Sequence, residues 1–271
     1  MRLTHEGVAL PIITALVYAF LYLPIIVLVA FSFNSARISA GWTGFTLAWY
    51  HALFEDASVR MALANSLKVS VAAAALSTAI GTAAAYALNG LRGRAGAAIR
   101  AVIYLPLIVP DIVIGVALVT LYTSVSLELG INTLIFSHLV FDSAYVTIIV
   151  LSRLSVYDAH LEEAAADLGA SPLRVFITVR LPLILPSVVA GTLLAFTLSF
   201  DDFIISLMTS GVGATTLPVK IYSMTRFGVS PAINALSTLI VAFTAFSIYL
   251  VHRLSVAYDS LRDDGRQSRV R

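Results

Sequence analysis

Four long stretches of this chain contain no Asp, Glu, Lys or Arg, and they limit what it can fold into more than any other feature. They run over residues 7–36, 69–91, 183–200 and 227–252. A helix needs about 20 mostly apolar residues to cross the hydrocarbon core of a membrane, so each stretch has room for one span. Charged residues make up 12% of the chain, against roughly 25% in a soluble domain. This composition excludes a cytosolic enzyme and a disordered regulator.

Two further spans are interrupted by ionisable residues. Residues 101–127 contain Asp111, and residues 133–152 contain His138 and Asp142. We therefore predict an all-α membrane protein with six transmembrane helices in a single domain over residues 1–271. The predicted spans are approximately 8–34, 66–91, 100–125, 133–153, 183–209 and 230–252, with a structured loop at 157–181 and a tail at 253–271.

The first apolar stretch and the basic residues together predict how the chain is oriented. The stretch at 7–36 is far longer than the roughly 7–15 apolar residues of a signal peptide, which favours a retained first helix. With a cytoplasmic N-terminus, 12 of the 17 Lys and Arg residues fall in cytoplasmic segments. Cytoplasmic loops of membrane proteins carry an excess of basic residues, so we expect both termini on the cytoplasmic side.

The loop between the fourth and fifth spans begins with features of a short helix. Residues 158–182 read DAHLEEAAADLGASPLRVFITVRLP. Asp158 is a suitable N-cap, and Glu162 and Glu163 place negative charge in the first turns, where the helix dipole favours it. Gly169 fits the left-handed position that closes a helix.

A second short helix is predicted to follow. Ser171 and Pro172 are typical of an N-cap and the first helical residue, and we expect this helix over 172–180, ending before Pro182. The product is a helix–turn–helix on the cytoplasmic side. The small residues Ala164 to Ala166 allow another protein to approach closely; the alternative is an ordinary amphipathic helix at the membrane interface.

The spacing within this loop resembles the EAA signature of ABC-importer permeases, E-A-A-x3-G-x9-I-x-L-P. Glu163, Ala164 and Ala165 are followed at that spacing by Gly169 and by VRLP at 179–182, with Val in place of the usual Ile. In that family the loop forms a coupling helix that docks on the ATPase subunit. The resemblance therefore implies a set of ATPase-coupling residues: Glu162, Glu163, Ala164, Ala165, Asp167, Gly169, Ala170, Pro172, Leu181 and Pro182.

Other segments extend the resemblance over most of the chain. YLPIIVLVAFSFNSAR, LPLIVPDIVIG, FTLSFDDFIIS and LPVKIYSMTRFGVSPAINALST are similar to permeases of the spermidine/putrescine (PotC-type) importers. This family implies the MetI-like fold of type I ABC importers in the bacterial inner membrane. It also implies a dimer of ATPase subunits, a second permease subunit, and a periplasmic or lipoprotein substrate-binding protein as partners.

Three carboxylates within the predicted spans mark candidate positions along a transport pathway. Asp111, Asp201 and Asp202 have no Lys or Arg in the central parts of those spans to pair with. An acid at mid-membrane costs roughly 2.5–3.5 kcal/mol on insertion scales, which makes a functional role the default hypothesis. Pro106 and Pro110 predict a broken helix before Asp111, which is tolerated where it lines a cavity. The alternative for Asp111 is a bond to a freed backbone amide.

The fifth span carries a polar stripe as well as two acids. Ser199, Asp202, Ser206 and Thr209 recur at helical spacing and predict a water-lined face. Because Asp201 and Asp202 differ by about 100° around a helix, we expect one of them to face the cargo, and we favour Asp202. The predicted pathway residues are Asp111, Ser199, Asp201, Asp202, Ser206 and Tyr222.

The sign of the charge indicates the class of cargo. Uncompensated carboxylates attract cations, and a polyamine, with ammonium groups on an apolar stem, suits acids interspersed with aromatic residues. Composition alone equally allows a metal ion, and within the resembled family ferric iron, thiamine, an opine or an aminophosphonate are alternatives. An ion-coupled secondary transporter would explain the acids but not the EAA spacing.

The sequence lacks the residue patterns that several kinds of chemistry require. The pattern G-x-x-x-x-G-K-[ST] does not occur, so ATP and Mg²⁺ would bind to the partner ATPase. We identify no catalytic residues, no metal ligand set and no cofactor site, and the chain has no cysteine. The net charge of +2 gives no reason to expect nucleic acid. The sequence thus predicts a transport subunit rather than an enzyme.

Overall fold

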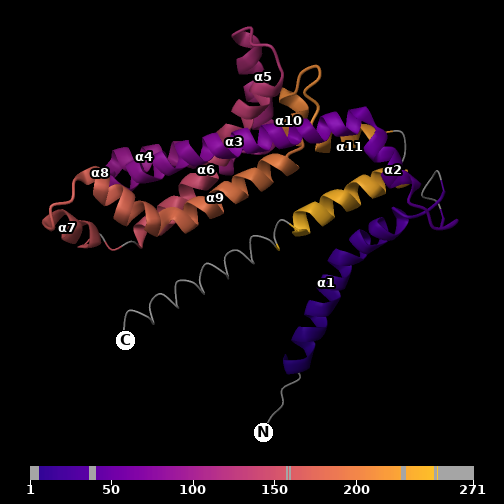
Figure 1. Ribbon diagram of the computed structural model, residues 1–271, viewed down its shortest axis with the longest axis horizontal. Coiled ribbons are helices and arrows are strands. Elements are labelled where there is room, and N and C mark those ends of the chain that lie inside the picture. The colour runs from indigo at the N-terminus through magenta and orange to yellow at the C-terminus, as the bar shows by residue number, and fades with distance from the viewer. Residues whose placement is uncertain are drawn as a thin grey trace. The chain divides into compact units, whose positions relative to one another are not determined.

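The computed structural model describes residues 6–36, 41–156, 158, 160–226, 230–246 and 249, which are almost entirely helical (Figure 1). In that part of the chain, extended pairing is confined to one antiparallel bridge between Asn34 and Phe45. The chain forms two compact units, where the sequence predicts a single domain. One comprises Met1–Ala57 and Ile221–Arg271, and the other comprises Ser58–Lys220. The predicted tail at 253–271 lies outside the described residues.

The first unit begins with α1 (Glu6–Phe31), which is apolar on all sides and has no buried residue between Leu10 and Phe31. The fully buried Asn34 then organises the loop before α2 (Ala48–Glu55). Its side chain accepts a hydrogen bond from the Thr43 amide (2.9 Å) and donates one to the Gly41 carbonyl (2.6 Å). Helix Pro231–Phe246 also belongs to this unit, and α11 (Leu217–Thr225) crosses from one unit to the other.

The second unit is built around α3 (Ala57–Gly90), α6 (Ile131–Ser155) and α9 (Leu181–Asp201). Val146 of α6 packs against glycines of the other two helices. A Cβ at Gly81 would lie 2.7 Å from Val146 Cβ, and a Cβ at Gly191 would lie 3.4 Å from Val146 Cγ1. Thr78 of α3 and Thr192 of α9 share a hydroxyl–hydroxyl hydrogen bond of 2.8 Å. Small residues therefore allow these three helices to approach closely.

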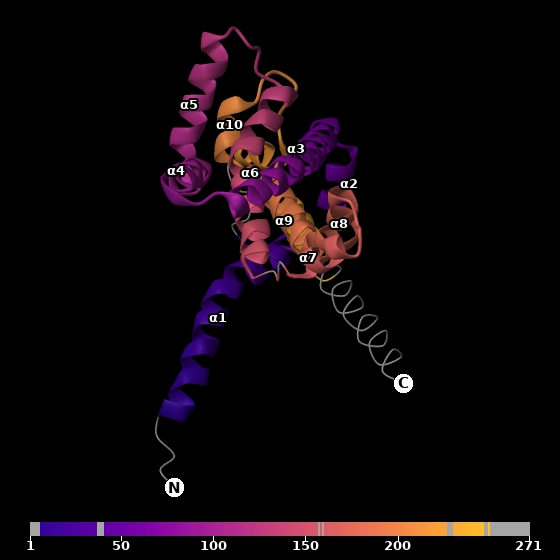
Figure 2. The same ribbon diagram turned by 90° about the vertical axis from the view of Figure 1, so that its left-hand side faces the viewer.

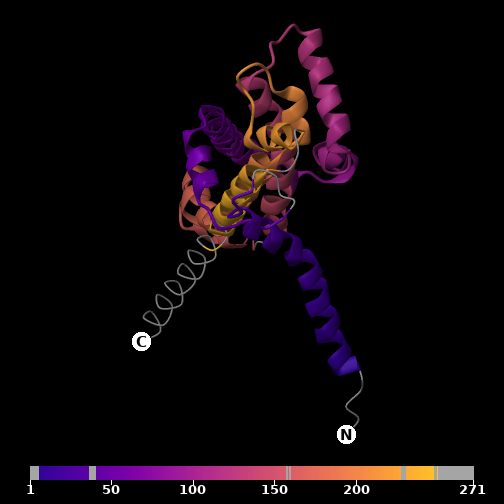
Figure 3. The same cartoon turned by 90° about the vertical axis from the view of Figure 1, so that its right-hand side faces the viewer.

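The third predicted span is broken, as its prolines predict. α4 (Gly93–Tyr104) and the 3-10 turn η1 (Leu105–Leu107) are followed by α5 (Asp111–Ser124). The two parts meet at a bend of 102°, which Figures 2 and 3 show from opposite sides. Pro106 and Pro110 lie at this junction, where each removes a backbone donor from the helical ladder.

The fifth predicted span is also divided, which the sequence does not predict. α9 ends at Asp201 and α10 (Ile204–Thr209) follows, with Asp202 in extended backbone conformation (φ −63°, ψ 128°). The expected continuous helix over 183–209 is therefore wrong. The polar stripe drawn along it does not form one helical face.

The described residues contain four single helices long and apolar enough to cross a membrane, and the bent α4–α5 pair provides a fifth span. Helix Pro231–Phe246 is shorter and lies within the sixth predicted span. α3 begins before the predicted residue 66, and α6 stays helical through His138 and Asp142. The single helices are Leu10–Phe31, Ala57–Gly90, Ile131–Ser155 and Pro172–Asp201.

Candidate functional site

The loop predicted at 157–181 folds as two short helices joined by a turn, α7 (His160–Asp167) and α8 (Pro172–Val175). Asp158 Oδ1 accepts a hydrogen bond from the His160 amide (3.1 Å), and Ser171 Oγ accepts one from the Arg174 amide (3.4 Å). Gly169 adopts φ +82°, the left-handed conformation that closes α7. The predicted helix–turn–helix and its caps are confirmed. Figure 1 shows it at the end of the bundle where α3 ends and α9 begins.

The second helix does not end before Pro182, contrary to the prediction. A π-helical turn, η2 (Phe176–Arg180), continues α8 into α9, and Leu181 and Pro182 form the first turn of α9. Proline lacks a backbone donor and its ring meets the carbonyl four residues earlier in a regular α-helix. The wider π turn accommodates the proline, so the loop joins the membrane helix without a flexible linker.

The two adjacent glutamates of α7 have different surroundings. The Glu163 side chain is 72% exposed and lies 3.1 Å from His160 Nδ1. The hydrogen bond to Glu163 raises the pKa of His160, and the negative charges of Asp158 and Glu163 act in the same direction. The Glu162 side chain is only 19% exposed and forms an ion pair with Arg180. Of the two, Glu163 is the one exposed to solvent.

The remaining loop residues divide between an outer surface and a groove. Ala164, Asp167 and Gly169 are exposed, and beside them lie two apolar side chains that the sequence analysis does not single out, Leu168 (89% exposed) and Leu173 (69% exposed). A leucine next to a helix-closing glycine is the signal that could have identified Leu168.

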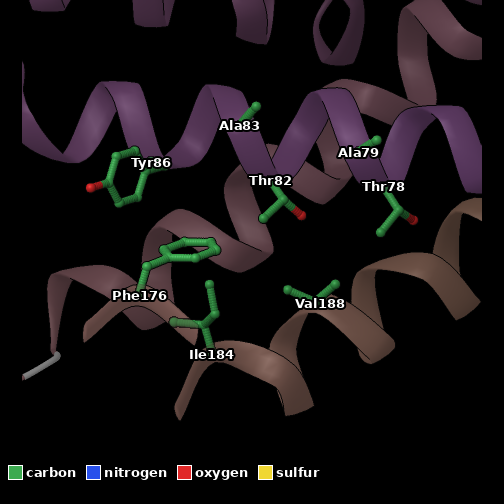
Figure 4. A pocket seen from close by; sticks show the side chains of 8 residues that line it. All are labelled: Thr78, Ala79, Thr82, Ala83, Tyr86, Phe176, Ile184 and Val188. Carbon is green, nitrogen blue, oxygen red and sulfur yellow. The ribbon is translucent and has the colours of Figure 1, made fainter. Parts of the chain in front are cut away.

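The groove, of about 310 Å³, lies between this loop and α3. A larger cavity of about 610 Å³ shares Tyr86 and Phe176 with it and continues between α3 and α9. Figure 4 shows the side chains that line this larger cavity, with Tyr86 and Phe176 at one end. The groove residues are Tyr86, Glu162, Glu163, Ala166, Ala170, Pro172, Val175, Phe176 and Arg180.

The junction between α9 and α10 is held by side chains rather than by proline. Asp202 Oδ2 accepts a hydrogen bond from the Ser206 amide (2.7 Å) and lies 3.4 Å from His138 Nε2. The fully buried His138 also contacts Ser199 Oγ through Nδ1 (2.5 Å) and Ser206 Oγ through Nε2 (3.1 Å). Ser199, Ser206 and Asp202 therefore face α6. The expected water-lined face is wrong for these three residues.

The remaining predicted pathway residues are all exposed. Asp201 is exposed at the end of α9, and Asp111 is exposed in the first turn of α5. Tyr222 is exposed on α11 in the other unit. Asp201 and Asp111 are thus accessible acids in apolar segments, whereas Asp202 is used within the bundle.

Two buried ionisable residues of α6 were not predicted as site residues. His138 links α6 to the α9–α10 junction, as described above. Asp142, one helical turn further along, is fully buried, and neither of its carboxylate oxygens has a hydrogen-bond partner among the described residues. Sequence spacing does identify the pair, because residues four apart share one face of a helix.

These features, several membrane-spanning helices interrupted by a structured helical loop, define a multi-pass membrane transport subunit. Comparison with known proteins agrees. Residues 77–259 match the family of binding-protein-dependent transport system inner membrane components. The chain is 41% identical over 238 residues to the putrescine transport system permease protein PotI of Escherichia coli (strain K12), covering 84% of each chain. It is 38% identical over 249 residues to the spermidine/putrescine transport system permease protein PotC of Shigella flexneri, covering 92% and 94%.

Solved structures show the same fold at lower sequence identity. A chain of a bacterial ABC transporter that imports the acidic polysaccharide alginate superposes with a TM-score of 0.70 at 16% identity, covering 93% of this chain and 98% of that one. A bacterial alginate ABC transporter in complex with its alginate pentasaccharide-bound periplasmic protein gives a TM-score of 0.70 at 18% identity, covering 91% of each chain. The chain belongs to the family of binding-protein-dependent inner membrane permeases of ABC importers, as the EAA spacing predicts.

Proposed function

We propose that this chain is a permease subunit of an ATP-driven importer of polyamines, with putrescine or spermidine as cargo. The observation that carries the cargo assignment is the 41% and 38% identity to permeases named for putrescine and spermidine/putrescine transport. Exposed acids in apolar segments, Asp111 and Asp201, support a path for cations. An anionic cargo would be repelled by the same two carboxylates.

Within the pathway, Asp201 is the residue that we propose meets the cargo. Asp202 is occupied by the Ser206 amide and by His138, and Ser199 and Ser206 hold the same histidine. These three residues form a support that places Asp201 at the end of α9. Asp111 begins α5 after the proline break and provides a second accessible carboxylate.

The loop is proposed to couple this permease to ATP hydrolysis. Its exposed residues, Glu163, Ala164, Asp167, Leu168 and Gly169, form a surface on which an ATPase subunit docks. The chain carries no nucleotide-binding pattern, so ATP and Mg²⁺ belong to a dimer of ATPase subunits. A second permease subunit and a substrate-binding protein complete the importer, and the distribution of basic residues supports a cytoplasmic position for the loop and both termini.

Uptake by the complete transporter tests the cargo assignment. Cells that lack other polyamine importers are expected to take up radiolabelled putrescine or spermidine saturably. Excess unlabelled polyamine should compete, while thiamine and ferric iron should not. Uptake should survive collapse of the proton and sodium gradients while ATP is maintained. Competition by thiamine or iron alone would contradict the cargo, and loss of uptake with the gradients would favour an ion-coupled carrier.

A further inference from the structure

The side chain of Arg180 connects three elements that meet at the loop end of the bundle. Its Nε and Nη2 atoms donate to the two carboxylate oxygens of Glu162 on α7. Its Cζ lies 4.5 Å from the centre of the Tyr86 ring on α3, in the geometry of a cation–π contact. Arg180 itself ends the π turn that continues into α9. We call Glu162, Arg180 and Tyr86 the Arg180 clamp.

α7 packs against α8 and η2, and the Arg180 clamp adds a contact that extends from α7 to α3. None of the eight residues of α7 is buried, so apolar packing does not fix its orientation. A helix of this length is marginal on its own, since isolated helices shorter than about 12–15 residues are unstable in water. Tyr86 and residues of α7 line the groove described above together. Glu162 and Arg180 bridge that space.

The clamp has the geometry of a contact that can fix the orientation of α7 relative to α3 and α9. A bidentate arginine–carboxylate pair fixes both the distance and the angle of its partners. The Glu162 and Arg180 side chains are each only 19% exposed, which shields the pair from solvent. The Tyr86 ring is in turn held edge-to-face by Phe176, with centroids 6.1 Å apart. Arg180 and Tyr86 are therefore each positioned by a second contact.

We propose that Arg180 and Glu162 are positioning residues that tie the orientation of α7 to α3 and α9, so that movement of the docked loop reaches the membrane helices. This rests on the proposed coupling function of the loop. It assigns the consecutive glutamates to different tasks: Glu163 meets the ATPase, and Glu162 acts through Arg180. Without the clamp, ATPase subunits would still dock and hydrolyse ATP, but less of the resulting movement of the loop would be transmitted to α3 and α9.

The first test measures uptake and ATP hydrolysis together, in liposomes that contain the complete transporter. Glu162→Gln and Arg180→Gln are expected to raise the ATP consumed per cargo by about fivefold or more, the scale of a typical coupling free energy. The double variant Glu162→Arg/Arg180→Glu restores the ion pair and should recover most of the loss. Glu163→Gln is the matched control and should lower ATP hydrolysis and uptake in proportion. A proportional loss in Glu162→Gln, or no change in it, would overturn the proposal.

The second test does not depend on the cargo or on assembly. The chain has no cysteine, so Leu168→Cys provides a single site for a spin label at the end of α7. In the full-length permease, Glu162→Gln and Arg180→Gln should increase the mobility of the label, and the charge-reversed pair should reverse the increase. Glu163→Gln should leave the mobility unchanged. If Arg180→Gln does not fold, Arg180→Lys takes its place. This variant keeps the charge but loses the bidentate geometry, so it should also increase the mobility of the label. Unchanged mobility in the clamp variants would refute the clamp even where polyamine uptake is confirmed.

Discussion

The loop helix α7 and the α9–α10 junction each contain two consecutive acids of one kind, and in each place the two acids have different environments. Glu162 is paired with Arg180 while Glu163 is exposed. Asp202 binds the Ser206 amide while Asp201 is exposed. Consecutive residues of α7 point about 100° apart, whereas Asp202 follows the end of α9 in extended backbone conformation; in both pairs one acid turns toward the bundle. The inner acid holds an element in place, and its neighbour stays exposed.

The two pairs differ in how much their inner acid should matter for stability. Glu162 faces a guanidinium at the edge of a water-accessible groove. The Asp202 side chain is 9% exposed and faces the fully buried His138 inside the bundle. Charges that lose most of their water are costly to leave unpaired, whereas solvent screens a pair at the surface. The inner acid of the junction should therefore be the more critical of the two.

The largest expected effect is on Asp202. Asp202→Ala removes the acceptor of the Ser206 amide and leaves His138 without its acidic partner, and we expect a loss of about 3 kcal/mol in unfolding free energy. Unfolding of the purified permease in detergent measures this. Asp201→Ala is the matched control and should change stability by less than about 0.5 kcal/mol. Equal losses in both variants would remove the distinction between inner and outer acid.

The next effect concerns transport rather than stability. Asp201→Asn keeps the side-chain volume and removes the charge that we propose attracts an ammonium group. A hydrogen bond to a charged group is worth roughly 1.5–3 kcal/mol, so polyamine uptake should fall by about tenfold. Membrane levels of the permease should not fall. Normal uptake in Asp201→Asn, together with lost uptake in a folded Asp202→Asn variant, would assign the cargo contact to the inner acid instead.

The smallest effect concerns the turn that presents Glu163. A Cβ at Gly169 would meet no atom within 4 Å, so Gly169→Val acts only through the left-handed backbone, at a cost of roughly 1–2 kcal/mol. We expect faster hydrogen exchange in α7 and weaker stimulation of the ATPase. Gly169→Asn, which tolerates this conformation, is the control and should behave like the natural chain. If Asn and Val have the same effect, the backbone conformation is not the cause.

The sequence predicts features whose cause is local. Uncharged stretches identify the spans because the membrane core excludes charge from the helix surface. Pro106 and Pro110 predict the α4–α5 break because proline removes a backbone donor. Asp158, Gly169 and the Ser171–Pro172 pair predict the loop helices, since capping depends on adjacent residues.

Features that depend on distant contacts could not be predicted in the same way. The α9–α10 break contains neither Gly nor Pro, and it depends on His138, more than 60 residues away in the chain. The partner of Glu162 lies 18 residues further on, across a turn. Hydropathy and spacing place each residue on its own helix but do not identify which other helix it meets. The polar stripe over Ser199 and Ser206 was therefore read as facing water, although it faces α6.

The packing of Val146 between Gly81 and Gly191 has a mechanical consequence. A slide of α9 along α6 would drive Val146 against residues larger than Gly191, so the packing favours a tilt of α9 about this contact. Its 21 residues give α9 a length of about 30 Å at the usual helical rise, and a tilt of about 10° about its middle would move each end by about 2.6 Å, in opposite directions. The loop continues into one end of α9, and Asp201 lies at the other end. A rotation at the loop end of α9 would therefore be matched by an opposite displacement of the end that carries Asp201.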